Sequence, residues 1–213
     1  MLLTLSAPPV DFLTDAELKA HLRIDHAYDD ATVTAVRLAA TSFLDGRYGY
    51  LNRALCTQTW LWSLPAFPLG NELHVPLPPL QSVVSVKYFD VTGVEQTLAA
   101  TEYRTHTNAY VGYLKLKPSA AWPATDERDD AVTLEFVAGY GAPAVIPAPV
   151  KAAALLMAGR LYANRGDGDD SRDALSEETL TMTEKRLLAS YRLQEFVSSN
   201  EQYWQNARAH PHR

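Results

Sequence analysis

The sequence is poor in the residues on which many reactive sites depend. Its 213 residues include a single cysteine, Cys56, so no disulfide can form within the chain. This is typical of proteins from reducing compartments. Two interpretations of Cys56 stay open: a buried small hydrophobe, or a nucleophile that would need a nearby base. The neighbouring sequence supplies no such base.

Long hydrophobic runs and an excess of basic residues are also missing. No apolar run approaches the ~20 residues that a membrane span requires, and the longest candidate contains Lys151 and Arg160. The first residues lack the basic and apolar regions of a signal peptide, so we expect a soluble protein made in the cytoplasm. The formal net charge of −6 argues against a general nucleic-acid-binding protein.

Familiar catalytic and metal-binding motifs are absent. None of the six histidines has the HExxH spacing, and the sequence has no GxSxG, GxGxxG or phosphate-binding glycine loop. Residues 166–170 superficially resemble a calcium loop, but Arg172 stands where such a loop needs glycine. The carboxylate run at residues 126–130 is typical of a solvated loop. We therefore expect no catalytic residues, no cofactor, no metal and no enzymatic activity.

The first part of the sequence that carries a clear pattern, about residues 12–55, is predicted to be helical. Thr14, followed three residues later by Glu17, forms a capping box that starts a short helix. Asp29 and Asp30 suit the positive end of a second helix. Hydrophobic residues then follow helical spacing.

Short runs of β-branched and aromatic residues alternate with turns over about residues 57–140. This pattern favours an antiparallel sandwich or small barrel. Helical spacing returns after Pro147, on a segment rich in small residues that permit close approach of another helix, and again over about 183–197. The predicted fold class is α+β: a helical bundle frame, made of two N-terminal helices plus C-terminal helices, with an inserted antiparallel β-sandwich or barrel-like module.

The predicted domain boundaries follow this order of elements. Residues 1–55 and 141–197 form the helical frame, residues 56–140 form the inserted β-rich domain, and residues 198–213 form a C-terminal tail. The helices on either side of the insert are expected to pack together, which keeps the ends of the insert close.

Aromatic residues are frequent in the predicted β-rich domain. A sugar-binding platform is one interpretation, and packing in the core or on a sheet face is the commoner use of such residues. They are Trp60, Trp62, Tyr88, Tyr103, Tyr113 and Trp122.

Large apolar and arginine residues also gather near the C-terminus, where a short segment has little core of its own. Such residues anchor interfaces, so one hypothesis is a docking segment, and the alternative is a helix folded back on its own chain. The candidate interface residues are Arg186, Tyr191, Arg192, Phe196, Tyr203, Trp204 and Arg208.

Several segments carry a family resemblance through their order and spacing. They are residues 18–25 with the acidic pair 29–30, residues 52–60, 77–86, 136–141 with 146–151, and 162–165. Together, over about residues 13–165, they are similar to the head–tail connector proteins of tailed phages, also called adaptor or neck proteins. Gene transfer agents, which are phage-like particles of some bacteria, use related parts.

The resemblance implies a structural virion protein. Such adaptors assemble as a ring of about twelve subunits between the portal and the next neck or tail component, and the ring extends the channel through which double-stranded DNA passes. The tail then becomes a possible portal-docking segment, and the particle neck the final location after synthesis in the bacterial host. The acidic balance suits a channel in which DNA must slide. The alternative is a β-sandwich module of a phage-like particle that binds carbohydrate or protein.

Overall fold

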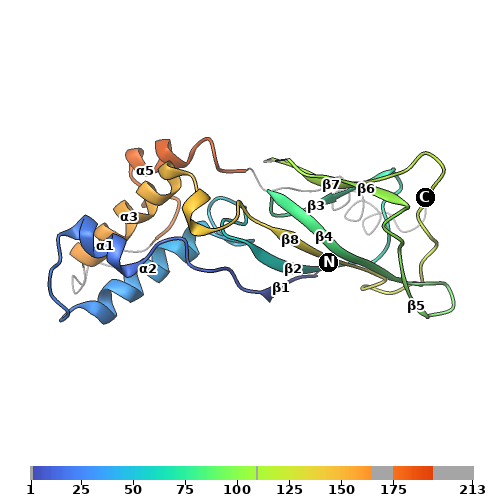
Figure 1. The fold of residues 1–213 in the computed structure, drawn as a ribbon, viewed down its shortest axis with the longest axis horizontal. Coiled ribbons are helices and arrows are strands. Elements are labelled where there is room, and N and C mark those ends of the chain that lie inside the picture. The colour runs from blue at the N-terminus through green and yellow to red at the C-terminus, as the bar shows by residue number, and fades with distance from the viewer. Residues whose placement is uncertain (1, 109, 165–174, 194–213) are drawn as a thin grey trace. The chain divides into compact units, whose positions relative to one another are not determined.

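A computed structural model describes residues 2–108, 110–164 and 175–193 of the chain (Figure 1). Helices and antiparallel sheets are both present, which confirms the prediction of a mixed α+β protein. None of the helices in the described ranges combines the length and the apolar character that a bilayer crossing demands.

The described chain divides into two compact units. Among the described residues, the β unit comprises 2–9, 57–108 and 110–139. The helical unit comprises 10–56, 140–164 and 175–193, so it is built from parts that are far apart in the sequence. Each unit has its own buried core.

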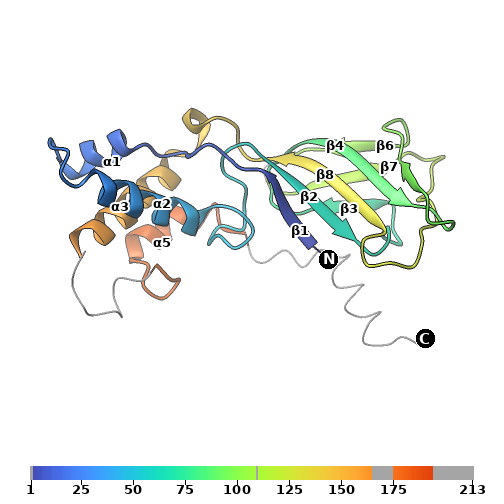
Figure 2. The same ribbon diagram turned by 90° about the horizontal axis from the view of Figure 1, so that it is seen from below.

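The helical unit contains four α-helices within the described residues (Figures 1 and 2). They are α1 (Asp15–Leu22), α2 (Asp30–Leu44), α3 (Ala148–Ala163) and α5 (Met182–Leu188), with a short 3-10 helix, η1 (Pro143–Val145), before α3. The predicted capping box is confirmed at the start of α1. The Glu17 N–H donates to Thr14 Oγ1 at 3.1 Å, and the Thr14 N–H donates to Glu17 Oε2 at 2.7 Å.

The core of the helical unit lies between α1, α2, α3 and α5. Small residues of α3 allow the close packing, since a Cβ atom at Gly159 would lie only 3.3 Å from Leu22 Cδ2 of α1. The small residues of α3, which the sequence suggested for close helix packing, therefore pack against other helices of the helical unit. Fully buried core residues are Leu18, Val33, Leu44, Val150, Ala153, Ala154, Met157, Ala158 and Leu188.

The β unit contains two antiparallel sheets. The larger sheet has the order β1-β2-β8-β4-β5 and consists of β1 (Leu2–Ala7), β2 (Gln58–Leu64), β8 (Val132–Ala138), β4 (Leu80–Phe89) and β5 (Glu95–Thr97). The smaller sheet has the order β3-β7-β6 and consists of β3 (Glu72–Val75), β7 (Gly112–Leu116) and β6 (Tyr103–His106). The two sheets lie one over the other (Figures 1 and 2).

Alternation of side chains defines the inner face of the larger sheet. Along β2 and β8 every second residue is buried. Trp60 pairs with Phe136 and Trp62 pairs with Leu134, so these four side chains form one inner-facing block. Gly112 of the smaller sheet permits close approach at this core, because a Cβ atom there would lie 2.4 Å from Leu80 Cβ of the larger sheet.

The structure differs from the sequence-based expectation at two places. Residues 1–55 are predicted as helical frame, whereas Leu2–Ala7 forms strand β1 of the β unit. The last helix, predicted over about 183–197, ends at Leu188 in the structure. The described residues after α5 are hydrogen-bonded to a turn far away in the sequence, since the Leu193 N–H donates to the Leu51 carbonyl at 3.1 Å. This tertiary contact replaces the helix that the hydrophobic spacing predicts after Leu188.

A buried arginine joins α2 to the segment that precedes and opens α1. The Arg37 Nε–H donates to Asp15 Oδ1 at 2.5 Å, and Nη1 donates to Asp11 Oδ2 at 2.8 Å and to the Leu13 carbonyl at 3.0 Å. Partial burial raises the pKa of Asp15, but hydrogen bonds from Arg37 and Thr34 outweigh it, so the pKa lies below the ordinary 3.8.

The substitution Arg37→Ala should lower the free energy of unfolding of the helical unit by about 2 kcal/mol, because it removes the hydrogen bonds to the Asp11 carboxylate, to Asp15 Oδ1 and to the Leu13 carbonyl. Because the pKa of Asp15 is lowered in the folded state, this contribution is present above pH 3.8 and is lost as the pH falls through the lowered value. Urea unfolding at several pH values measures both effects. Arg186→Ala, on the exposed side of α5, is the control, and equal losses in both variants would contradict the prediction.

Candidate functional site

The structure describes three of the seven candidate interface residues. Arg186 is exposed on α5, and Tyr191 and Arg192 follow the end of that helix. The other four lie outside the described residues: Phe196, Tyr203, Trp204 and Arg208. The proposed portal-docking tail at residues 198–213 also lies outside them.

Helix α5 is fixed at its start by a second capping box. The Thr181 N–H donates to Glu184 Oε2 at 2.6 Å, and the Glu184 N–H donates to Thr181 Oγ1 at 3.2 Å. Glu184 is 1% exposed, and its carboxylate lies 3.6 Å from Arg160 Nη2 of α3. Leu188 is buried on the same helix. These contacts hold α5 against α3 and leave Arg186 facing solvent.

The residues after α5 are tied to the turn that follows α2. The Arg53 Nε–H donates to the Tyr191 carbonyl at 2.5 Å, and the Asn52 Nδ2–H donates to the Leu193 carbonyl at 3.0 Å. Arg53 is only 1% exposed. We call this arrangement of residues 191–193 on residues 51–53 the C-terminal clamp. It fixes the position of residues 191–193 on the helical unit.

The Arg192 side chain closes the clamp from the outside. Its guanidinium donates to both carboxylate oxygens of Glu177, with Nη2 2.7 Å from Oε2. Its Cζ lies 4.3 Å from the centre of the Tyr50 ring, a cation–π contact, and that ring stacks on Phe43 at 5.7 Å. The hydrogen bond from Arg192 lowers the pKa of Glu177. Arg192 therefore serves an internal contact, and its role at an interface stays a prediction.

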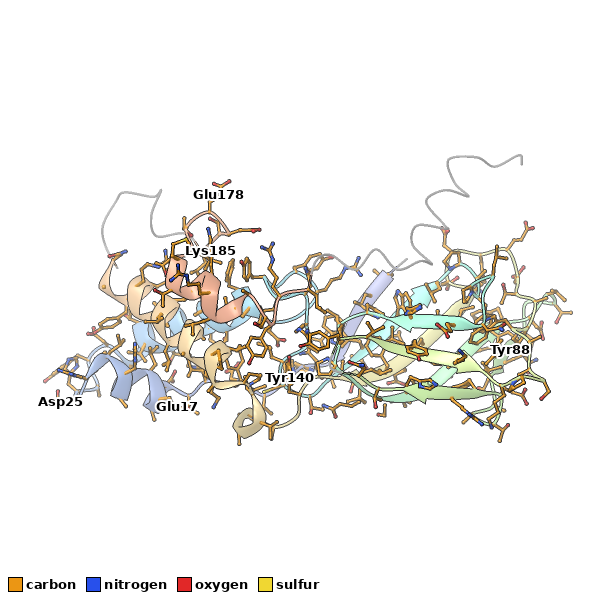
Figure 3. All side chains as sticks on the ribbon, turned by 90° about the horizontal axis from the view of Figure 1, so that it is seen from above. Glu17, Asp25, Tyr88, Tyr140, Glu178 and Lys185 are labelled. Atoms are coloured by element: carbon orange, nitrogen blue, oxygen red, sulfur yellow. The ribbon has the colours of Figure 1, made fainter. Side chains whose placement is uncertain are left out.

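The exposed side of α5 is mixed in character. Lys185 on α5 and Glu178 in the preceding turn lie on the same side of the helical unit (Figure 3). Met182 is 67% exposed beside them in the sequence. This surface offers charges of both signs and one flexible apolar side chain.

The reactive-site candidates do not assemble into a catalytic arrangement within the described residues. Cys56 is 2% exposed, and burial, together with the charge of Asp45, raises the pKa of its thiol to about 11. This favours the interpretation of Cys56 as a buried hydrophobe over a nucleophile. Within the described ranges no three His, Cys, Asp or Glu side chains are grouped as metal ligands would be.

The two acidic loops have different outcomes. In the run at residues 126–130, Arg128 donates to both oxygens of Asp130 and lies 3.8 Å from the centre of the Phe89 ring. Asp126 is half-buried, and the carboxylates of Glu127, Asp129 and Asp130 are exposed, as expected of a solvated loop. The calcium-like segment at residues 166–170 lies outside the described residues.

Most of the aromatic residues that could have formed a sugar-binding platform are structural. Trp60, Trp62 and Tyr103 are buried, and Trp122 stacks on Phe67 with ring centres 4.8 Å apart. Tyr113 is the exception, because it is on the outer face of the smaller sheet.

A row of rings on that outer face is not apparent from the sequence. His74, Tyr113 and His106 are directly paired across β3, β7 and β6. The His106 and Tyr113 rings stack at 4.6 Å, and the His74 and Tyr113 rings lie 5.5 Å apart. In the next row Lys115 Nζ lies 2.7 Å from Glu72 Oε1. We call the three rings the aromatic row. Only the strand register brings them together.

The fold defines a mixed α+β chain with a two-segment helical unit and a β unit of two antiparallel sheets. No protein-family model and no curated protein matches the sequence. Solved structures do match it, and a chain in the neck of an empty GTA particle, computed with C6 symmetry, has a TM-score of 0.70. That chain is 23% identical, and the match covers 91% of this chain and 96% of that one.

Two further chains show the same likeness. One belongs to the virion of a native gene transfer agent (GTA) particle, with a TM-score of 0.69, 23% identity and coverage of 94% of this chain and 100% of that one. The other belongs to the neck of a native GTA particle computed with C12 symmetry, with a TM-score of 0.67, 23% identity and coverage of 91% and 96%. The chain therefore shares its fold with particle proteins over nearly its whole length.

Replacing Arg192 should loosen the C-terminal clamp. In Arg192→Ala the Leu193 amide, which donates to Leu51, should exchange its hydrogen faster, because the contacts with Glu177 and Tyr50 that hold the neighbouring backbone are lost. Residue-resolved hydrogen exchange measures this.

A matched pair of variants at Tyr50 separates the ring contact from the hydroxyl. Tyr50→Phe keeps the ring under the guanidinium and should change exchange at Leu193 little, whereas Tyr50→Leu should accelerate it. Unchanged exchange in both Arg192→Ala and Tyr50→Leu would show that the Leu193 amide and the Asn52 and Arg53 side chains hold the clamp without Arg192.

Proposed function

We propose that this chain is a structural head–tail adaptor of a tailed phage or gene transfer agent. In this role about twelve copies form a ring between the portal and the next neck or tail component, and the ring extends the DNA channel. The observation that carries the proposal is the end-to-end likeness to neck chains. It covers 91% of this chain and 96% of the neck chain, so both units take part in the match.

The two units suggest a division of labour. The helical unit acts as a helical bundle frame, in which α2 and α3 bring the two sequence segments together around one core. The β unit acts as a sandwich inserted into that frame, and it presents sheet faces and edges to neck partners. In the sequence-based boundaries the frame is 1–55 and 141–197 and the insert 56–140. The structure supports moving the first strand to the insert.

The chemistry of the chain is consistent with a passive role. An adaptor needs interfaces and no reaction, and the described residues offer no reactive thiol and no grouped metal ligands. A net charge of −6 disfavours tight binding to phosphates, which suits a lumen through which double-stranded DNA slides without sequence-specific binding.

The contact with the portal is assigned to the C-terminal segment. The C-terminal clamp fixes the position of residues 191–193, and the exposed Arg186 lies on the helix just before them. Beyond the clamp come aromatic and basic residues of the kind that anchor interfaces. The docking set is Arg186, Tyr191, Arg192, Phe196, Tyr203, Trp204 and Arg208.

A second candidate function is a binding module for carbohydrate or protein. The aromatic row favours it, because the half-buried Tyr113 ring lies on the same sheet face as the exposed Lys115 and Arg104 and so resembles a surface for a polar ligand. Glycan-array binding by the full chain, lost in Tyr113→Ala, would favour this function. Retained particle assembly in the same variant would separate it from the adaptor role.

Electron microscopy of particles that contain the protein tests the adaptor proposal directly. We expect density for a ring of this chain at the neck, next to the portal. A chain truncated after Val197 should keep the thermal unfolding of the full chain but no longer join portals, because Tyr203, Trp204 and Arg208 of the docking set are removed. A truncated chain that attaches to portals normally would contradict the docking assignment, and particles without a neck ring would contradict the adaptor role.

A further inference from the structure

Strand β1 forms one edge of the larger sheet. Among the described strands it is hydrogen-bonded to β2 alone, and it is the first strand in the sheet order. Its sequence, LLTLSA, has no charge and no proline. Sheet edges of soluble proteins are commonly blocked by charged residues, proline or bulges, because an open edge can pair with another chain. The ladder from Leu2 to Leu5 is regular.

The opposite edge of the same sheet is also partly unpaired among the described strands. β5 covers only residues 87–89 of β4, and the Leu98 N–H reaches the Val86 carbonyl. The preceding half of β4, residues 80–85, has only β8 as a sheet neighbour among the described strands. This half is uncharged as well, with the sequence LQSVVS, and its pairing with β8 shifts in register between Leu80 and Ser82 and between Val83 and Ser85. The missing charges, and not a regular ladder, are what it shares with β1.

The remaining edge strands of the β unit differ from these two. β3 carries Glu72 and His74, β6 carries Arg104, and β5 carries Glu95. Charges of this kind discourage pairing with another chain. The two uncharged segments therefore lie at opposite edges of one sheet. Within a single chain, β1 cannot pair with residues 80–85 of β4.

Exposed apolar side chains mark the same two edges. Leu2 is 65% exposed and Leu5 is 41% exposed on β1, and Val84 is 56% exposed on β4. Val84 lies at a register shift between β4 and β8, which turns it out of the ladder. A strand paired at each edge would cover these side chains.

Strand direction determines how two copies could join. Three antiparallel steps separate β1 from β4, so the two strands run in opposite directions within the sheet. A rotation about an axis parallel to the strands preserves their order and direction. It places β1 of one copy beside β4 of the next, antiparallel, with Leu3 and Val83 both on the inner face.

We propose that neighbouring copies of this chain pair β1 of one with residues 80–85 of β4 in the next, so that the larger sheet continues from subunit to subunit. The contact joins two different surfaces, and contacts of that type close into rings when the rotation allows it. The inference rests on the proposed ring-forming adaptor and names the contact between its subunits.

Cysteine cross-linking of the full chain tests the pairing. Thr4 of β1 is on the outer face opposite Leu61, and Ser82 and Ser85 of β4 are on the same face. A Thr4→Cys chain mixed with a Ser82→Cys or Ser85→Cys chain should form disulfide-linked dimers under oxidation, because facing residues of paired strands lie within disulfide reach. A chain that carries Thr4→Cys together with Ser82→Cys or Ser85→Cys should form disulfide-linked oligomers larger than dimers. The native Cys56 is buried, so the unmodified chain is the background control.

The outcomes distinguish the arrangement from its alternatives. Cross-links from Thr4→Cys alone would indicate a two-fold β1–β1 contact and overturn the proposal. So would equal cross-linking between Thr4→Cys and Thr105→Cys on the edge strand β6, or no cross-link at all. A neck ring seen by electron microscopy without β1–β4 cross-links would overturn this inference and leave the adaptor role intact. Cross-links between β1 and β4 without any neck ring would overturn the adaptor role and leave the strand pairing intact.

A charge on the edge provides an independent test. Thr4→Lys should abolish the oligomers trapped through a Ser85→Cys and Leu2→Cys pair, because a lysine on an edge strand blocks pairing. Circular dichroism and thermal unfolding should match the unmodified chain, since Thr4 is exposed. Thr105→Lys on β6 is the matched control and should leave the oligomers unchanged.

Discussion

The pairing of β2 with β8 is the constraint on which the rest of the chain depends. These strands begin and end the long β insertion, and they are paired in continuous register from Gln58 with Ala138 to Leu64 with Val132. The insertion therefore starts and finishes at the same place. In the helical unit, Cys56 forms a parallel bridge with Gly141, and the Tyr140 N–H donates to the Leu55 carbonyl. Because the chain returns to its starting point, α2 and α3 can share one core although about a hundred residues separate them.

Local sequence patterns predict the elements whose stability is local. The capping box at Thr14 and Glu17 needs only four consecutive residues, and alternation along β8 needs only the strand itself. β1 escapes prediction, because its residues gain their strand partners from β2, more than fifty positions later. The end of the last helix escapes for a similar reason. The backbone groups of residues 191–193 form hydrogen bonds with the turn at residues 51–53. These long-range bonds end the helix at Leu188, although helical spacing continues beyond it in the sequence.

The candidate sites, too, can be predicted from the sequence only where they depend on local features. Large aromatic and arginine residues near the C-terminus can be found by composition, but the contact of Arg192 with Glu177 and Tyr50 depends on the turn that the clamp holds. The aromatic row needs the register of three strands, since His74, His106 and Tyr113 are spaced irregularly in the sequence. Uncharged edges are visible in the sequence only after the sheet order is known.

The shortness of the two open edges bears on when a ring would form. A ladder over about six residues offers few backbone hydrogen bonds, and each adds only about 0.5–1.5 kcal/mol net. Association of two free chains costs about 4–15 kcal/mol in lost motional freedom. On the proposed arrangement a single contact between two copies is therefore weak. A copy inside a ring makes two such contacts, and a copy seated on a portal has already lost its freedom of motion. Weak contacts of this kind thus favour assembly on a template over assembly in solution, and a free copy would then stay unpaired despite its uncharged strand edges.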